Sequence, residues 1–247
     1  DNILRERKKS TDVLSTSKNI IYFNENYFRD YDNAKINKFL MRNPRTFRTW
    51  YDYIMHYGLS KVKLELEDLK YDYNKGYFLY ILGYIGELDY LYSKNTMKDI
   101  IPSTLKILSQ YGNGMPILLK PHTLTDMNIL NNILKEYNFK NIHLTYLHPS
   151  ALSVNAKLVV SNHFSGTQAD AYFFGAKTVE YSHYSNLALE KTNGQSMNPN
   201  YIDHFINNDP EKFKKIIQDS LLIKNKNKVR NILEDSNESL KIEKFLL

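Results

Sequence analysis

Apolar and polar residues alternate along most of the chain in blocks that predict an α/β fold. Short apolar runs, typical of buried strands, occur at residues 77–82, 116–120, 142–145, 158–161 and 178–181. Segments with apolar residues at helical spacing separate or follow these runs, at residues 94–110, 125–137, 151–156, 167–174 and 210–221. Strands that alternate with helices over short connections favour a mainly parallel sheet with helices on both faces. We therefore expect a Rossmann-like domain.

The first 70 residues have a different pattern. Residues 1–18 are mostly charged or polar, and the apolar run at 20–23 predicts one short strand. From residue 33 to residue 70 the apolar spacing is helical, with Pro44 and Gly58 as interruptions. We expect residues 1–70 to form a mostly helical attachment or the remnant of a first domain. Residues 71–247 are then the Rossmann-like domain, with a polar loop at 185–200.

The composition is that of a soluble globular protein with a substantial core. Of 247 residues, 42% are hydrophobic and 24% are charged, which is ordinary for such proteins. No run approaches the roughly 18 apolar residues of a membrane span, and the first residues lack the features of a secretory signal. Cysteine is absent, which excludes a disulfide framework and thiolate metal ligands. We expect a cytoplasmic protein, with the inner face of a membrane as an alternative location.

The net charge of +6 narrows the class of partner. Lys and Arg are scattered, and no arginine-rich block interleaves with aromatic residues as a nucleic-acid groove requires. A nucleic-acid partner is therefore not expected. Basic charge also favours other phosphate-bearing ligands, and such a ligand fits an α/β domain better than a nucleic acid does.

The first candidate site follows the strand at 116–120. Lys120, Pro121 and His122 come directly after this apolar run, and proline cannot continue a sheet ladder. Ligands of parallel sheets bind at the carboxyl ends of the strands, where a lysine and a histidine could both reach a phosphate. The alternative is a lysine at a strand end and a histidine packed in a turn.

The second candidate site follows the strand at 158–161. A turn of small residues, Ser165, Gly166 and Thr167, leads into a helix. Unpaired N–H groups at the start of a helix bind anions, and Gly166 lets a ligand approach the backbone closely. Simple capping of the helix by Ser165 or Thr167 is the alternative.

Three further residues stand beside strand ends. Glu180, near the end of the strand at 178–181, could accept hydrogen bonds from ribose hydroxyls or pair with Lys177. His148 could face a nucleotide from the loop after the strand at 142–145, where Ser150 is expected to cap the next helix. Glu87, after two glycines, is a candidate acid or base, although a solvated turn residue explains it as well.

Several other chemistries lack their motifs. Seven histidines are present, but no His-Glu-x-x-His or comparable spacing predicts a zinc site. The chain has neither a phosphate-binding Gly-x-x-x-x-Gly-Lys-Ser/Thr loop nor a Gly-x-Gly-x-x-Gly fingerprint. Ser165 is not part of a Gly-x-Ser-x-Gly nucleophile elbow. We therefore expect no metal site.

Taken in order, these motifs resemble a known family. A strand followed by Gly-x-x-Gly-Glu, a strand followed by Lys-Pro-His, a His-Pro loop and Ser-Gly-Thr-x-x-Asp-Ala-x-x-x-Gly-x-x-x-Val-Glu-Tyr occur within residues 76–220. This order resembles the C-terminal domain of GT-B-fold glycosyltransferases. The most similar groups are bacterial capsule and surface-polysaccharide transferases, including those that transfer Kdo and sialic acid. Thr123, where this family usually has proline, is a departure.

The resemblance implies a role for each matching residue. Lys120 and His122 fall on a segment that holds the phosphate of a sugar nucleotide, and residues 165–167 fall on a second such segment. Asp170 falls where relatives often carry an acidic residue on the following helix, and Glu180 falls at the end of the next strand. The chain is shorter than a two-domain GT-B enzyme, so we expect it to be one half of that fold.

The expected function is that of a glycosyltransferase, or its donor-binding half, in surface polysaccharide or glycan synthesis. The donor is a nucleotide-sugar, with a CMP-linked sugar as one candidate, and no further cofactor or metal is expected. The acceptor is a glycan or a lipid-linked glycan, and Glu87 and Asp170 are the candidate catalytic carboxylates. Peripheral association with a membrane or a biosynthetic complex stays open. The alternatives are a nucleotide-sugar epimerase of the same fold and a non-catalytic nucleotide-sugar-binding subunit.

Overall fold

The computed structural model describes residues 19–22, 37–40, 44–83, 91–163, 165–223 and 228–230. The chain forms two compact units, one of residues 1–50 with 233–247 and one of residues 51–232. The division expected at residue 70 stays a prediction. Within the described residues, no helix is long and apolar enough to cross a membrane.

The smaller unit contains one pair of parallel strands, β1 (Asn19–Tyr22) and β2 (Asn37–Leu40). β1 confirms the strand predicted at 20–23. β2 lies in the region with helical spacing, so the helical prediction is wrong for these four residues. An apolar pattern this short fits a strand and a helix equally well, and pairing with β1 decides the outcome. A short helix, η1 (Pro44–Thr46), follows.

A run of helices leads into the larger unit and confirms the helical pattern before residue 70. It comprises α3 (Arg48–Tyr53), η2 (Ile54–Gly58), α4 (Leu59–Asp68) and η3 (Tyr73–Lys75). In α4, Val62 and Leu66 are four residues apart and fully buried. This spacing places both side chains on one face of the helix, which packs near α7.

The larger unit is built on a six-stranded sheet in which every neighbouring pair is parallel. The strands are β3 (Tyr77–Ile81), β4 (Ile117–Lys120), β5 (Ile142–Leu144), β6 (Ala156–Ser161), β7 (Thr178–Ser182) and β8 (His204–Asn207). Their order across the sheet is β5-β4-β3-β6-β7-β8. The predicted mainly parallel Rossmann-like sheet is therefore confirmed.

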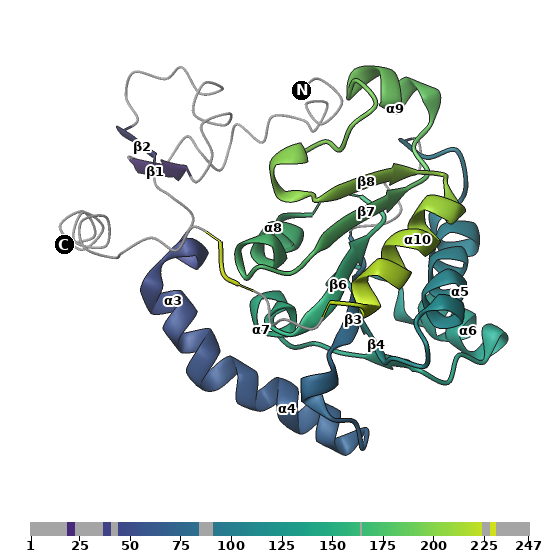
Figure 1. Ribbon diagram of the computed structural model, residues 1–247. Coiled ribbons are helices and arrows are strands. Elements are labelled where there is room, and N and C mark those ends of the chain that lie inside the picture. Colours follow the sequence, from purple (N-terminus) through teal and green to yellow (C-terminus); the bar gives the residue numbers. More distant parts are fainter. Residues whose placement is uncertain are drawn as a thin grey trace. The chain divides into compact units, whose positions relative to one another are not determined.

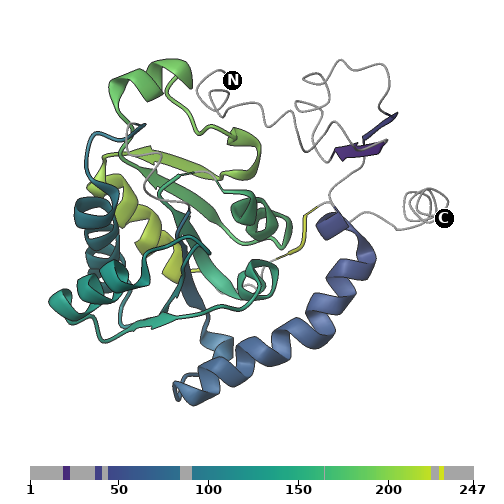
Figure 2. The same ribbon diagram turned by 180° about the vertical axis from the view of Figure 1, so that it is seen from behind.

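Helices cover both faces of this sheet. α5 (Ile101–Tyr111), α6 (Met127–Tyr137) and α10 (Pro210–Leu221) lie on one face, and α7 (Pro149–Ser153), α8 (Gly166–Phe173) and α4 lie on the other (Figure 1). The view from behind shows the same two layers (Figure 2). A helical turn, η5 (Thr96–Ile100), runs directly into α5.

The core explains why the central strands are easy to predict. All five residues of β3 are buried, as are Ile117, Leu118 and Leu119 of β4. Phe78 and Tyr80 belong to the apolar cluster under α5 and α10. Alternate residues of a strand point to opposite faces, so continuous apolar runs are required where both faces are covered.

Three elements lie where the sequence predicts a loop or no structure. α9 (Asn186–Lys191) falls inside the predicted polar loop at 185–200, and the short helix η6 (Pro199–Tyr201) closes it. β8 is an edge strand in which only Ile206 is buried. Its apolar signal is weak because an edge strand buries less of its surface. α7 begins two residues before the predicted helix at 151–156, and Ala156 already belongs to β6.

The topology locates the place to look for a ligand. Chain connections proceed from β3 outward to β5, then return to β6 on the other side of β3 and continue to β8. The reversal lies between β3 and β6. In open parallel sheets, ligands bind outside the carboxyl ends of the strands at this switch point.

Candidate functional site

The loops after β4 and β6 meet over the carboxyl end of β3. β3 ends near Gly83, and a Cβ atom added there would lie 2.0 Å from Cε1 of His163. The imidazole of His163 therefore fills the space that any other side chain at residue 83 would need. A glycine at this place lets a residue from the β6 loop reach across the end of β3.

His163 lies close enough to His122 for their charges to interact. Burial, with a smaller contribution from His122, lowers the pKa of His163 to about 4. His163 is therefore neutral near pH 7. Because His122 comes from the loop after β4, this interaction brings the two predicted loops to the same edge of the sheet.

His122 has its side chain fixed by local hydrogen bonds. Its Nδ1 atom accepts a hydrogen bond from the backbone N–H of Leu124 at 3.2 Å. Its own backbone N–H donates to Oγ1 of Thr125 at 3.0 Å. A neutral imidazole that accepts at Nδ1 carries its proton at Nε2, so His122 presents a donor at the far end of the ring.

Lys120 lies at the end of β4, opposite Ile81 of β3 in the sheet register. Its side chain is half-buried, and burial lowers its pKa, whereas the carboxylate of Glu65 raises it. Burial raises the pKa of Glu65, which projects from α4, whereas the nearby Thr145 in the loop after β5 lowers it. Lys120 is thus a cation at the strand end with the carboxylate of Glu65 in its vicinity.

The start of α8 combines a cap with an open backbone. Ser165 is the N-cap residue, and its Oγ accepts a hydrogen bond from the N–H of Thr167 at 3.4 Å. The hydroxyls of Ser165 and Thr167 are 2.8 Å apart. A Cβ atom added at Gly166 would meet no atom within 4 Å. The capping interpretation is therefore confirmed, and the backbone at Gly166 is still accessible to a ligand.

Buried hydrogen bonds fix the loop after β6 to the sheet. Ser161 donates from its hydroxyl to Oε1 of Gln168 in α8 at 2.7 Å. Gln168 in turn donates from Nε2 to the carbonyl of Val179 in β7 at 3.0 Å. These bonds tie β6, the start of α8 and β7 together. The small-residue turn thus has a rigid base.

Asn162 makes a second buried connection on the other face of the sheet. Its Nδ2 donates to Oγ1 of Thr104 at 3.0 Å and to the carbonyl of Tyr181 at 2.9 Å. Its Oδ1 accepts a hydrogen bond from the hydroxyl of Tyr80. One amide side chain therefore connects β3, β6, β7 and α5 just below the switch point.

Glu180 is fully buried rather than exposed at a strand end. β7 continues two residues beyond it, and its Oε2 accepts a hydrogen bond from the hydroxyl of Ser196 at 2.6 Å. Burial raises its pKa to about 6, although contacts with Ser196 and the hydroxyl of Tyr184 lower it. The carboxyl thus lies beside the switch point, behind the chain that follows β7.

Two stacked tyrosines connect the region of His163 with that of Glu180. The rings of Tyr92 and Tyr184 stack at 5.6 Å between centroids, and an isolated β-bridge joins the same residues. The ring of Tyr92 also lies 6.4 Å from that of His163. The aromatic pair forms an apolar wall beside the loop after β6.

His148 has a structural role that the sequence assigned to Ser150. His148 is the N-cap residue of α7, and its Nδ1 accepts a hydrogen bond from the N–H of Ser150 at 3.1 Å. The expectation that Ser150 caps this helix is therefore wrong. Ser150 lies inside the first turn, after Pro149, and proline is favoured at that first position.

One of the two candidate catalytic carboxylates, Asp170, is buried and does not lie at the open edge of the sheet. Asp170 lies within α8 and is 1% exposed. A catalytic base must come within hydrogen-bond distance of the hydroxyl that it deprotonates, so this burial argues against contact with an acceptor. Glu87 lies outside the described residues.

Sequence reasoning missed two residues of this site. His163 stands between the strand and the small-residue turn, and its position two residues after Ser161 places it on the α8 face of the sheet. That signal was present in the sequence. Glu65 lies on a helix before the first strand of the sheet, and no local pattern connects it with Lys120.

The described residues contain no group of three or more His, Asp or Glu side chains arranged to hold a metal ion. The chemistry available at this edge consists of a lysine, two imidazoles, hydroxyls and a helix N-terminus. The lysine is a cation, and the helix N-terminus offers hydrogen-bond donors. The hydroxyls and the neutral imidazoles can both donate and accept hydrogen bonds. Groups of this kind are suited to interact with an anion.

No protein-family model matches the chain, and no curated protein matches it. Among solved structures, the chain is similar to the UDP-GlcNAc 2-epimerase of Methanocaldococcus jannaschii in complex with UDP-GlcNAc and UDP. The identity is 18% and the TM-score 0.42, over 84% of this chain and 54% of that one.

Two further solved structures are a wall teichoic acid polymerase and a protein in complex with UDP. The wall teichoic acid polymerase TagF with CDPG is 16% identical with a TM-score of 0.49, over 83% of this chain and 49% of that chain. Os79 from O. sativa in complex with UDP is 10% identical with a TM-score of 0.32, over 63% and 37%.

The chain spans about half the length of the first solved structures that it matches. All identities are below 25% and all TM-scores below 0.5. Functional inference therefore depends on the residues of this chain.

Proposed function

We propose that this chain binds a nucleotide-activated sugar at the carboxyl edge of its sheet and is the donor-binding half of a glycosyltransferase. One observation carries the proposal. His163, in the loop after β6, lies over Gly83 at the end of β3. His122, in the loop after β4, is near enough to lower the pKa of His163, so both loops border the topological switch point. This is the place and the chemistry that a sugar nucleotide's phosphate requires.

The phosphate is held from two sides in this proposal. Lys120 supplies a positive charge, and His122 supplies a donor at Nε2, because its Nδ1 already accepts from Leu124. The open backbone at Gly166 and the positive end of α8 supply further donors. These groups stabilise the negative charge that develops on the leaving phosphate when the sugar is transferred.

His163 positions this site rather than carrying charge. It is neutral near pH 7 because its pKa is about 4. A neutral imidazole can donate from one nitrogen and accept at the other, so it suits a hydroxyl of the donor sugar. Its imidazole extends from the loop after β6 over Gly83, at the end of β3.

The catalytic base is a separate question. Because Asp170 is buried, Glu87 is the carboxylate of this chain that we propose for the acceptor hydroxyl. The acceptor in this proposal is a glycan or a lipid-linked glycan of surface polysaccharide synthesis. The leaving phosphate is stabilised by protein cations and amides, so the proposed reaction needs no metal ion.

Two substitutions test the phosphate site. His122→Ala removes one donor and Thr167→Val removes one hydroxyl from the start of α8. Each change should weaken binding of a nucleotide-sugar by about 1–3 kcal/mol, measured by calorimetry. His56→Ala, at an exposed histidine of η2, is the matched control and should leave affinity unchanged. Unaltered affinity in both site variants would remove the assignment.

A further inference from the structure

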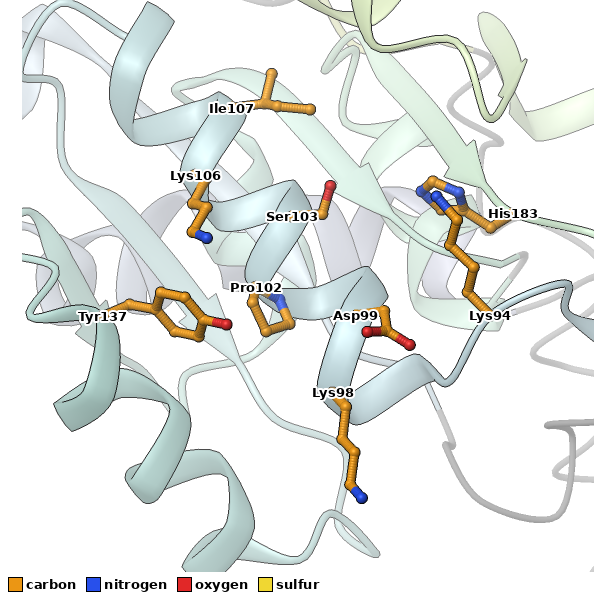
Figure 3. Close-up of a pocket in the computed structure, with 9 residues that line it drawn as sticks. All are labelled: Lys94, Lys98, Asp99, Pro102, Ser103, Lys106, Ile107, Tyr137 and His183. Atoms are coloured by element: carbon orange, nitrogen blue, oxygen red, sulfur yellow. The ribbon is translucent and has the colours of Figure 1, made fainter.

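An open groove of about 590 Å³ lies along α5, on the face of the sheet away from Gly166. Its wall includes Lys94, Lys98, Asp99, Lys106, Tyr137 and His183, and we call it the α5 groove. Figure 3 shows these side chains around η5 and the first turns of α5. Its volume is typical of pockets for small molecules.

The α5 groove has an excess of positive charge. Its wall contains three lysines, Lys94, Lys98 and Lys106, and one carboxylate, that of Asp99. Oδ2 of Asp99 already accepts a hydrogen bond from the backbone N–H of Asn95 at 3.2 Å. Lys106 lies over the ring of Tyr137 at 4.3 Å, which keeps its ammonium group at the groove. The charge balance favours an anionic ligand.

His183 closes one end of the groove in a defined tautomer. Its Nδ1 lies 3.0 Å from Oδ1 of Asn208, and the ammonium of Lys94 lies 3.5 Å from the same oxygen. An ammonium group can only donate, so the shared atom is an acceptor. Nδ1 of His183 therefore donates, and burial together with the charge of Lys94 lowers the pKa of the ring. In this neutral tautomer, Nε2 is an acceptor.

That acceptor has no donor among the residues that the structure describes. His183 is 2% exposed, and Nε2 has no hydrogen-bond partner among the described residues. Figure 3 shows the ring extending from the end of β7 toward α5, on the groove side. A buried acceptor that lacks a donor is unfavourable, because its interaction with water is lost without replacement. A hydroxyl group of a ligand would supply the missing donor.

We propose that the α5 groove is a second ligand site, which binds a phosphorylated sugar or polyol. The phosphate lies among the three lysines, and a hydroxyl of the same molecule donates to Nε2 of His183. His183 has the same orientation in β7 as Val179 and Tyr181, which pack under α5 and α10. Glu180 and Ser182 point to the other face, so this site is separate from the nucleotide-sugar site.

The experiment is a calorimetric titration of the full chain with four probes. These are glucose 1-phosphate, glycerol 3-phosphate, inorganic phosphate and methyl glucoside. At least one phosphorylated probe should bind at least tenfold more tightly than inorganic phosphate, and methyl glucoside should not bind detectably. A saturating nucleotide-sugar should not displace the bound probe, which separates this site from the one proposed above.

Variants assign the binding to the groove. Lys94→Ala with Lys98→Ala should weaken the phosphorylated probe at least fivefold. The same double change at Lys61 and Lys75, two exposed lysines elsewhere, should have no effect. His183→Asn keeps a polar group near Nδ1 and removes the Nε2 acceptor. The affinity of this variant for the phosphorylated probe should fall to its affinity for inorganic phosphate. His183→Gln keeps an acceptor near the position of Nε2. This variant should therefore still bind the phosphorylated probe more tightly than inorganic phosphate.

Several outcomes would overturn the proposal. Equal affinity for inorganic phosphate and both phosphorylated probes would indicate an adventitious ion only. Absence of binding by all probes at millimolar concentration, or displacement by the nucleotide-sugar, would also overturn it. If the His183 variants do not fold, the variant with both Lys94→Ala and Lys98→Ala tests the proposal, because those two side chains are exposed and their loss should not unfold the protein. An unchanged affinity in that variant contradicts the assignment.

Discussion

The carboxyl group of Glu180 is the clearest case of one residue linking stability to the candidate site. It is fully buried, and its pKa rises from an ordinary 4.5 to about 6. The folded protein therefore binds this proton more tightly than the unfolded chain does. The resulting stabilisation is present below about pH 4.5 and is lost as the pH rises through about 6.

We predict that Glu180→Gln removes this pH dependence. The amide is neutral at every pH and can still accept the hydrogen bond from Ser196. Relative to the wild type, the variant should gain about 2 kcal/mol of unfolding free energy between pH 4.5 and pH 7.5. Urea denaturation at the two pH values measures it.

The wild type and the Glu180→Gln variant must be compared with each other, because His163 changes the unfolding free energy with pH in the opposite direction. Its lowered pKa means that stability is lost as the pH falls from about 6.5 toward about 4. This contribution is common to both proteins and cancels in the difference. Stability profiles that run parallel would show that Glu180 does not titrate in this range.

For single residues, the sequence predicts the position in the fold better than it predicts burial and hydrogen-bond partners. Lys120, His122 and Ser165 are at the strand and helix ends where the pattern placed them. The burial of Glu180 could not be predicted, because Ser196 and Tyr184 cover it from the segment after β7. The capping role of His148 was missed for a similar reason, since a histidine at an N-cap has no strong signal.

The arrangement of elements depends on a glycine at the end of β3. Because residue 83 has no side chain, His163 from the loop after β6 reaches over the end of β3 toward His122. The site is thus built by three neighbouring strands, β4, β3 and β6. It does not belong to one motif.

A double-mutant cycle tests this arrangement. Gly83→Ala places a methyl group where the imidazole of His163 lies, so it should lower the unfolding free energy by about 1–3 kcal/mol. In a His163→Ala background the space is free, and the same change should cost clearly less. Chemical denaturation of the wild type, both single variants and the double variant gives the coupling energy. Strictly additive effects would contradict the close approach of the two residues.

The sequence predicts elements well where burial is complete on both faces. β3, β4, β6 and β7 read as continuous apolar runs because helices cover both sides of the sheet. β8 and β2 were missed because neither has a continuous apolar run and each depends on pairing with a neighbour. Gly175 follows the C-cap residue of α8, and its φ of +80° is the left-handed conformation that favours glycine.

For the whole molecule, the alternation of strands and helices was sufficient to predict the Rossmann-like architecture. The order β5-β4-β3-β6-β7-β8 was not predictable, because strand order depends on long-range contacts. That order sets the switch point and thereby gives the predicted loops a common location. Residues 51–232 form one compact unit that contains every described residue of the candidate site.

The most direct test of the central claim is a calorimetric titration of the full chain with CMP-, CDP-, UDP- and GDP-sugars. The account predicts saturable binding of at least one of them with one site per chain, and loss of that binding in the His122→Ala, Thr167→Val double variant. It would be contradicted if none of the four binds at millimolar concentration, or if binding persists unchanged in the double variant.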